Sequence, residues 1–194
     1  SSRGPATDGR IKPDIAAQGT AVTSTIEGNQ YDTYTGTSMA CPNVAGSLTL
    51  LYEAFGDHHG EHPDGGLMKA IVLNTAEDLG NTGPDFKFGW GRINARRAYS
   101  TIEQGTFIVD SIASGAGANS HEITVPAGAN RLRVMVYWTD PAATISASTA
   151  LVNDLDLTGF SPNNDTLLPY VLNHLPNAIT LDEPAVFGED HLNN

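Results

Sequence analysis

The chain changes its residue pattern near Gly105, and this change constrains what it folds into. Before Gly105, several segments carry apolar residues three and four positions apart, which is typical of helices. After Gly105, the apolar segments are short, rich in β-branched and aromatic residues, and separated by Gly, Asn, Pro and Ser clusters, which is typical of strands. We therefore expect two domains, residues 1–104 with mixed helices and strands and residues 105–194 with strands alone.

The first part contains one long segment with a helical period, from Ser38 to Phe55. Its apolar residues recur on one face: Val44, Leu48, Leu51, Tyr52 and Phe55. A second helix is predicted in 67–78, and a third, short helix follows the glycine-rich turn of 88–100. The β-branched segment 21–26 predicts a short strand, followed by a hairpin or loop. These elements are typical of an α/β domain.

The second part consists of short segments with strand character, predicted at 106–113, 121–126, 130–140, 150–160 and 167–173. Their spacing favours a sandwich or barrel. Five or six strands are fewer than the eight of a complete jelly roll. We therefore expect a jelly-roll-like β-sandwich in 105–194 that is incomplete at its C-terminus.

The charge of the chain excludes some classes of partner. Its formal net charge is −12, with 22 acidic and 10 basic residues, so it repels nucleic-acid backbones. No apolar run approaches the roughly 20 residues that cross a bilayer, so we expect no membrane span. Cys41 is the one cysteine and cannot form an internal disulfide. No partner for its thiol is identifiable from the sequence, so we expect a buried structural cysteine.

Ser38 stands directly before the long predicted helix, and two interpretations of this position compete. As a helix N-cap, its hydroxyl would accept a hydrogen bond from a backbone N–H, and Pro42 in the first helical turn fits that role. As a nucleophile, it would use the free N–H groups and the positive dipole end of the helix for a developing oxyanion, with Gly36 permitting a tight turn. The position alone favours capping, because cap residues are common and nucleophiles are rare, although it also suits acyl transfer.

A resemblance decides between these interpretations. The stretch GTSMACPNVAG, residues 36–46, closely resembles the nucleophile signature of subtilisin-like serine proteases. Four further segments resemble that family in the same order: SSRGP, KPDIAAQGTAV, LMKAIVLNTAEDL and FGWGRINARRA. The resemblance implies that 1–104 is the C-terminal half of a three-layer catalytic domain and that Ser38 is the nucleophile of a secreted endopeptidase acting on proteins or peptides. Asn43, Cys41 and Gln18 depart from the residues usual in the family.

The resemblance also implies a catalytic aspartate, a histidine and an oxyanion asparagine upstream of the serine. All six histidines follow Ser38 in this chain: His58, His59, His62, His121, His174 and His191. None stands in a segment resembling the catalytic histidine of the family, and we interpret His58, His59 and His62 as a solvent loop. We therefore expect the chain to be the C-terminal part of a protease, to need the missing N-terminal part as its partner, and to be inactive alone.

A second resemblance concerns residues 134–162, which resemble the β-sandwich that follows the catalytic domain in some secreted subtilisin-like proteases. Within it, Asn153, Asp154 and Asp156 place three oxygen-bearing side chains within four residues. Calcium binds several oxygen ligands, so we predict a calcium site there, with Asp140 as a weaker candidate ligand. The alternative is a solvated acidic face in an acidic protein.

Two other functions remain open at this point. One is a non-catalytic binding or stabilising module carried by 105–194. The other is an α/β-hydrolase-type esterase that pairs Ser38 with a downstream aspartate and one of His121, His174 and His191. The nucleophile turn of those esterases is G-x-S-x-G, whereas here Ala40 stands in the last place.

Overall fold

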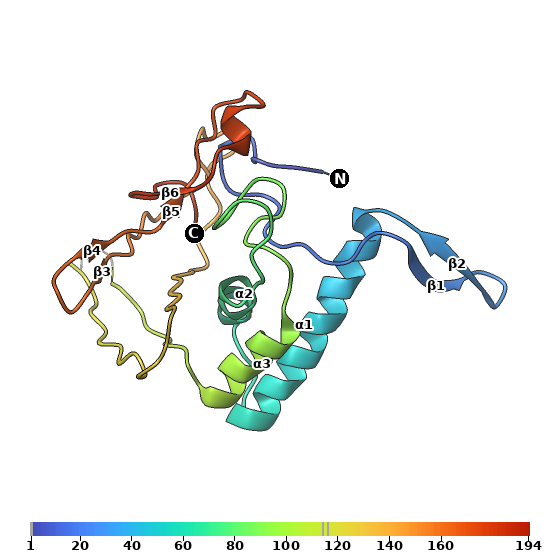
Figure 1. The fold of residues 1–194 in the computed structure, drawn as a ribbon, viewed down its shortest axis with the longest axis horizontal. Coiled ribbons are helices and arrows are strands. Elements are labelled where there is room, and N and C mark those ends of the chain that lie inside the picture. The colour runs from blue at the N-terminus through green and yellow to red at the C-terminus, as the bar shows by residue number, and fades with distance from the viewer. Residues whose placement is uncertain (1, 114, 116) are drawn as a thin grey trace.

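A computed structural model describes residues 2–113, 115 and 117–194. Three helices pack together in the middle of the molecule, and a hairpin projects from one side (Figure 1). The C-terminal part of the chain lies on the other side of the helices as long irregular segments with a few short strands.

The long helix α1 spans Thr37–His59 and confirms the helix predicted from Ser38 to Phe55. It ends at Gly60, whose φ of 73° is left-handed and whose N–H bonds the carbonyl of Gly56. Glycine adopts this conformation without the steric cost that other residues meet, so the helix stops there.

The helices α2, Gly65–Asn74, and α3, Ala95–Gln104, confirm the other two helix predictions. The side chains of Asp64 and Asn94 cap their N-termini by accepting backbone N–H bonds. The sequence pattern placed the second helix at 67–78. In the structure the helix begins two residues earlier, at Gly65, and ends four residues earlier, at Asn74, which is followed by the C-cap Thr75.

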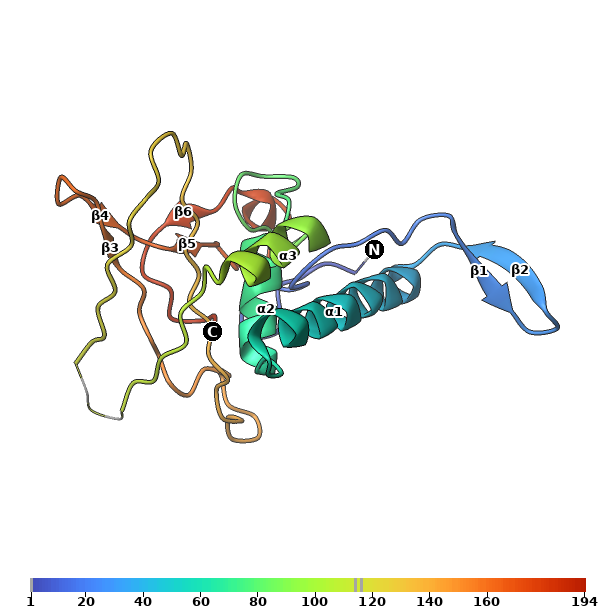
Figure 2. The same cartoon turned by 90° about the horizontal axis from the view of Figure 1, so that it is seen from below.

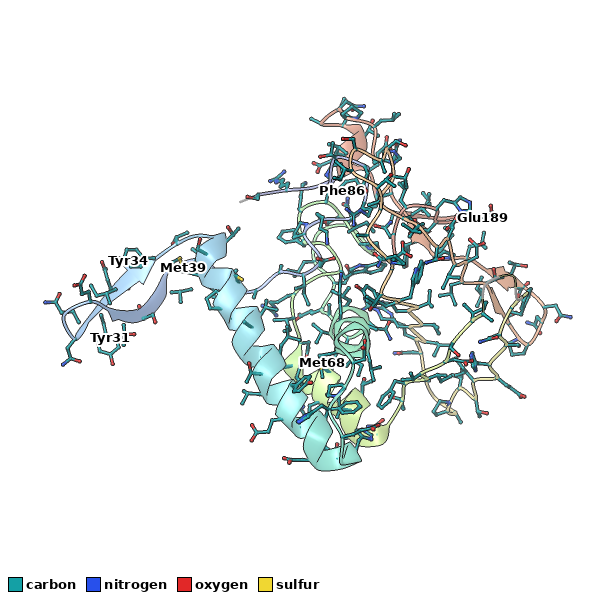
Figure 3. All side chains as sticks on the ribbon, turned by 180° about the vertical axis from the view of Figure 1, so that it is seen from behind. Tyr31, Tyr34, Met39, Met68, Phe86 and Glu189 are labelled. Atoms are coloured by element: carbon teal, nitrogen blue, oxygen red, sulfur yellow. The ribbon has the colours of Figure 1, made fainter. Side chains whose placement is uncertain are left out.

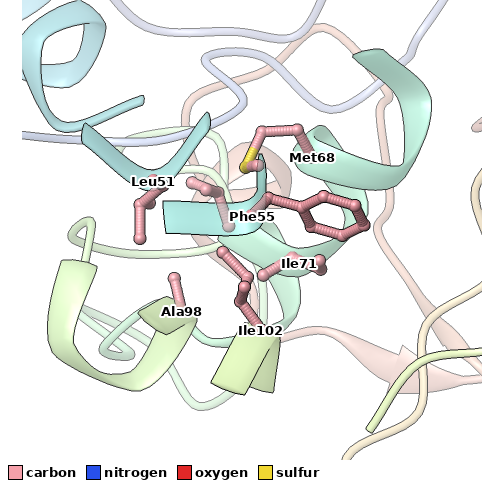
Figure 4. Packing of buried hydrophobic residues seen from close by; sticks show 7 residues of the cluster. Leu51, Phe55, Met68, Ile71, Ala98 and Ile102 are labelled. Atoms are coloured by element: carbon pink, nitrogen blue, oxygen red, sulfur yellow. The ribbon is translucent and has the colours of Figure 1, made fainter. Parts of the chain in front are cut away.

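One buried cluster joins the three helices (Figure 4). Its members come from the C-terminal half of α1 and from α2 and α3: Leu51, Phe55, Met68, Ile71, Val72, Ala98 and Ile102. The first half of α1 contributes no residue to this buried set. The first half of α1 therefore extends beyond the core, and most of its residues are exposed.

The projecting hairpin consists of β1, Val22–Ile26, and β2, Gln30–Tyr34, paired antiparallel. Gly28 and Asn29 take left-handed φ values of 78° and 59°, as the tight turn requires. Figure 2 shows the hairpin reaching well away from the rest of the molecule, and Tyr31 is 72% exposed. Within the described residues, the hairpin therefore has no layer packed on it.

The two ends of the first part lie side by side. The N–H of Trp90 bonds the carbonyl of Asp14 at 3.0 Å, and Ala16 bonds Gly91 and Ile93 in turn. Gly91 has a φ of 117°, and a Cβ on it would lie 2.2 Å from the carbonyl oxygen of Glu77. The glycine-rich turn predicted at 88–100 is therefore needed for this close backbone approach.

The strand predictions after Gly105 are largely wrong for the structure. In the described part of 105–194, the regular strands have two residues each: β3 Gly159–Phe160, β4 Thr166–Leu167, β5 Tyr170–Val171 and β6 Val186–Phe187. They form the pairs β3–β4 and β5–β6, with the short helix η1 at Thr180–Asp182. The predicted segments 106–113, 121–126 and 130–140 form no regular strand among these residues.

Segment 130–140 shows the physical reason why the predicted strands do not form. Exposure alternates along this segment, as in a strand: Met135 and Tyr137 are half-buried, whereas Val134 and Val136 are 48% and 42% exposed. A strand also needs neighbours that pair its backbone and cover its apolar face. Since neither is present among the described residues, the β-sandwich is not confirmed and stays a prediction.

The molecule exposes far more surface than a compact protein of its size. Its accessible surface is 12988 Å², whereas a compact monomer of 20.5 kDa exposes roughly 8,900 Å². Much of the excess lies on the hairpin, the outer face of α1 and the C-terminal part. In the described part of the chain, no helix is both long and apolar enough to cross a membrane.

Candidate active site

Ser38 is the second residue of α1 and is exposed to solvent. The N-cap of this helix is Gly36, and no side chain caps it. The capping interpretation of Ser38 is therefore wrong, because the serine lies inside the first helical turn. Its hydroxyl has no hydrogen-bond partner in the described residues and is left available for other chemistry.

The turn before Ser38 is held by the segment that precedes the hairpin. The N–H of Gly36 bonds the carbonyl of Gly19 at 2.8 Å, and the N–H of Ala21 bonds Oγ1 of Thr35 at 2.9 Å. A Cβ on Gly19 would lie 2.6 Å from the carbonyl oxygen of Gly36, so only glycine permits this approach. The orientation of the first turn of α1 thus depends on direct backbone contact.

The start of α1 has the polarity that an oxyanion requires. The first N–H groups of a helix lack intrahelical partners and carry the positive end of its dipole. The N–H groups of Thr37 and Ser38 have no partner in the described part of the chain. Pro42 is the sixth residue of α1, not part of its first turn as expected, and it provides no N–H for the carbonyl of Ser38.

The three histidines nearest in sequence lie at the other end of α1. His59 is its last residue, 21 positions after Ser38, and a helix of that length spans about 30 Å. The predicted loop is wrong for His58 and His59, which form the end of α1, although both are exposed to solvent as expected. The ring of His59 lies 4.4 Å from that of Phe55, and its Nε2 lies 2.9 Å from the carbonyl oxygen of Ile102. His62 stacks on Tyr52.

The remaining histidines are engaged elsewhere. His121 lies 3.2 Å from Asp110, and His191 Nδ1 lies 2.8 Å from Asp154. The ring of His174 lies against Gly9. Figure 3 shows Met39, next to Ser38, and Glu189, two residues before His191, on opposite sides of the molecule. The residues that the structure describes therefore bring no imidazole to Ser38.

Cys41 is exposed, which corrects the expectation of a buried thiol. It lies on the half of α1 that extends beyond the core cluster. The prediction was based on the lack of an identifiable partner for the thiol in the sequence. Among the described residues nothing covers this face of the helix, and the thiol therefore meets solvent.

The predicted calcium ligands separate into two groups. Asp154 and Asp156 lie together, and His191 joins them, with one ligand atom from each within 4.8 Å of the others. Asn153 instead turns to Asp140, whose Oδ1 accepts its backbone N–H at 3.0 Å and its side-chain N–H at 2.7 Å.

Sequence reasoning did not find His191 because it lies 37 positions after Asp154. A short motif cannot report a contact between residues so far apart in the chain. The hydrogen bond that His191 donates to Asp154, followed by the charge of that carboxylate, raises the pKa of His191 above its ordinary value. A protonated His191 and Asp154 form an exposed ion pair.

The comparisons with known proteins concern mainly the first part of the chain. The model of the subtilase family matches residues 1–91. Alkaline elastase YaB of Bacillus sp. (strain YaB) is 39% identical over 87 residues, which cover 44% of this chain and 20% of that protein. The extracellular serine protease of Serratia marcescens is 40% identical over 68 residues, which cover 35% of this chain and 6% of that protein.

One relative is similar over a longer stretch. The serine protease/ABC transporter B family protein tagD of Dictyostelium discoideum is 26% identical over 231 residues, covering 81% of this chain. That share exceeds residues 1–104, so the similarity extends into the second part. The chain spans 13% of that relative's length, and thus corresponds to a small portion of it.

Proposed function

Because residues 1–91 match the model of the subtilase family, we propose that this chain supplies the nucleophile of a serine endopeptidase and that Ser38 is that nucleophile. The observation that carries the proposal is the place of Ser38. It lies in the stretch GTSMACPNVAG, inside the matched range, at the exposed start of a long helix with free N–H groups.

The proposed reaction is acyl transfer. The Oγ of Ser38 attacks the carbonyl carbon of a peptide bond while a histidine accepts its proton, and the amine leaves with a proton from that histidine. Water then hydrolyses the acyl-enzyme by the same route. The N–H of Ser38 and the dipole of α1 stabilise the negative oxygen of each tetrahedral intermediate.

The general base in this proposal comes from outside these 194 residues. The large exposed surface supports this, because the free faces of α1 and of the hairpin offer a docking area for the other half of a catalytic domain. The chain alone then has an alcohol without a base, which is a poor nucleophile at neutral pH. We propose that it is inactive until that half is present.

The proposed substrates are proteins or peptides, and the proposed location is extracellular. The basis is the match of residues 1–91 to the subtilase model, together with the relative described as an extracellular serine protease. The esterase alternative gains no support, because His121, His174 and His191 contact other residues. Nothing specific favours a non-catalytic module in 105–194 either.

The function is tested by peptide hydrolysis with the full-length gene product that contains these residues. Ser38→Ala should reduce kcat by several orders of magnitude and leave KM little changed, because it removes the reacting atom but not the cleft. Ser47→Ala is the matched control, since Ser47 lies on the same helix and only donates to the carbonyl of Asn43. Hydrolysis that survives Ser38→Ala would refute the assignment.

We also propose that a calcium ion binds at 153–156, with Asp154 and Asp156 as its carboxylate ligands, whereas Asn153, predicted as a further ligand, instead bonds Asp140. The repulsion between two neighbouring carboxylates favours a shared cation. Calcium should raise the melting temperature of the chain, and Asp154→Asn or Asp156→Asn should remove most of that rise. Asp165→Asn serves as the control. An equal calcium response in all four proteins would show that these carboxylates are not ligands.

A further inference from the structure

A hollow of about 550 Å³ lies between the end of α2, the start of α3 and the segment 130–133. It is separate from the turn that carries Ser38, because none of its lining residues comes from that turn. All six lining residues have hydrogen-bonding side chains: Asn74, Thr75, Arg97, Asn130, Arg131 and Arg133. The hollow is open to solvent, and its lining lacks the apolar side chains usual in sites for small molecules.

The charge of the hollow is opposite to that of the chain. The net charge is −12 with only 10 basic residues, yet three arginines line this one hollow and no acidic residue does. The carboxylate of Glu77, on which the charge of Arg97 acts, pairs with Arg92 at 2.6 Å. Its pKa lies below the ordinary value because of the hydrogen bond and charge of Arg92, with a smaller effect of Arg97. The main partner of Glu77 is thus Arg92, which does not line the hollow.

The local structure fixes the side chain of one arginine and the backbone of another at its wall. Arg133 Nη1 donates to the carbonyl oxygens of Asn74 and Ala76 at 3.3 Å and 2.7 Å, which ties segment 130–133 to the end of α2. Arg97 lies in the first turn of α3, where its N–H bonds the capping side chain of Asn94 at 3.0 Å. The positive end of the α3 dipole therefore adds to the arginine charges.

We propose that this hollow binds a small multivalent oxyanion, either a phosphate ester or a polycarboxylate. The planar guanidinium group presents paired donors that match carboxylate and phosphate oxygens. Three such groups around one volume favour an anion with several negative oxygens over a single carboxylate. No aromatic side chain lines the hollow, so it lacks a surface on which a base or sugar ring would stack. The proposal does not depend on the proposed peptidase activity.

The test is an anion titration of the 194-residue chain at constant ionic strength, with citrate and inorganic phosphate as separate probes. Thermal unfolding and helical circular dichroism are both recorded. A bound anion raises the melting temperature of a folded chain and increases the helicity of a partly folded one. Citrate acting alone would identify a polycarboxylate site, and phosphate acting alone a phosphate site, and each would support the proposal.

The variants Arg97→Gln and Arg131→Gln should each weaken the anion response about tenfold, because each loses a charged donor. Arg96→Gln is the matched control, since Arg96 lies beside Arg97 on α3 but does not line the hollow. Arg133 is left intact because it caps α2. An absent response, or an equal response in the parent and all variants as in general salting-out, would overturn the proposal.

Discussion

Gly19 and Gly36 set the direction in which α1 leaves the preceding turn, because their backbones touch. Only a residue without a Cβ permits the 2.8 Å bond from the N–H of Gly36 to the carbonyl of Gly19 at this separation. The first turn of α1 holds Ser38 and the free N–H groups proposed to bind the oxyanion. A small displacement of this turn therefore moves the nucleophile and the oxyanion donors together.

Gly19→Ala tests this contact. The new Cβ would lie 2.6 Å from the carbonyl oxygen of Gly36 and 3.1 Å from Cβ of Ala40, so the turn must shift. We expect a loss of about 1–3 kcal/mol in the free energy of unfolding, measured by urea denaturation. Gly46 lies on α1, and a Cβ on it would have no heavy atom within 4 Å, so Gly46→Ala should instead be neutral or stabilising. Equal effects of the two substitutions would contradict the account.

Asp14 pairs with Lys12 of its own segment and with Lys69, which joins that segment to α2. Its carboxylate lies 2.6 Å from Lys12 and 3.3 Å from Lys69. Burial opposes its ionisation, but the hydrogen bond from Lys12 and the charges of Lys69 and Lys12 outweigh it and lower the pKa of Asp14. The folded state therefore binds this proton more weakly than the unfolded state, whose aspartates titrate at about 3.9.

Because the pKa of Asp14 is lower in the folded state than in the unfolded state, the stability of the fold depends on pH. The contribution of Asp14 is complete above about pH 5 and is lost as the pH falls below about 4 through the lowered pKa. Asp14→Asn should reduce the urea midpoint at neutral pH and flatten its decline in acid. Asp32→Asn, on the exposed hairpin, should leave the acid decline unchanged. A parent-like decline in Asp14→Asn would remove Asp14 from this role.

Among the elements, α1 is divided into two halves with different surroundings. Its C-terminal half packs on α2 and α3, whereas its N-terminal half and its outer face are exposed. Within the C-terminal half, the neighbours Leu50 and Leu51 show the contrast between the outer and inner faces, since they are 69% and 3% exposed. The same helix thus anchors the core with one side and offers an uncovered surface with the other.

Leu51→Ala and Leu50→Ala form a matched pair for this division. In the 194-residue chain, Leu51→Ala should cost about 2–5 kcal/mol of unfolding free energy, because it leaves a cavity in the core. Leu50→Ala should change that energy by less than about 0.5 kcal/mol. In the full-length gene product, Leu50→Ala should become costly if another half covers this face. Equal costs in the short chain would contradict the observed packing.

The helices and the hairpin were predictable because local signals determine them. The apolar period of α1, the caps of α2 and α3, and the β-branched strand β1 all act over a few residues. The second part was not predictable in this way. Val134 and Val136 alternate as a strand requires, but the strand forms only where distant segments pair with it. The contact between His191 and Asp154 depends on such distant segments too.

The site was predicted in part, for the same physical reason. The stretch around Ser38 predicted a helix start, and the structure places Ser38 in the first turn of α1, whereas its role as a nucleophile stays a prediction. The exposure of Cys41 and the position of Asn153 beside Asp140 were missed. Both depend on which distant residues lie near, and a local motif carries no information about them.

At the scale of the whole molecule, the surface of 12988 Å² is the main constraint on function. Apolar residues on the hairpin and on α1 remain uncovered, and all six histidines are remote from Ser38. Both features agree with a chain that provides the nucleophile and one oxyanion donor but takes its base from another part of the enzyme. We therefore expect Ser38 to react only when that part is present.

Covalent labelling with a fluorophosphonate probe, mapped by mass spectrometry, tests this claim most directly. The probe reacts with a serine that a neighbouring base activates. The account predicts labelling at Ser38 in the full-length gene product, loss of that labelling in Ser38→Ala but not in Ser47→Ala, and no labelling of the 194-residue chain alone. Efficient labelling of Ser38 in the isolated chain would contradict the account, because it would place a base within these residues.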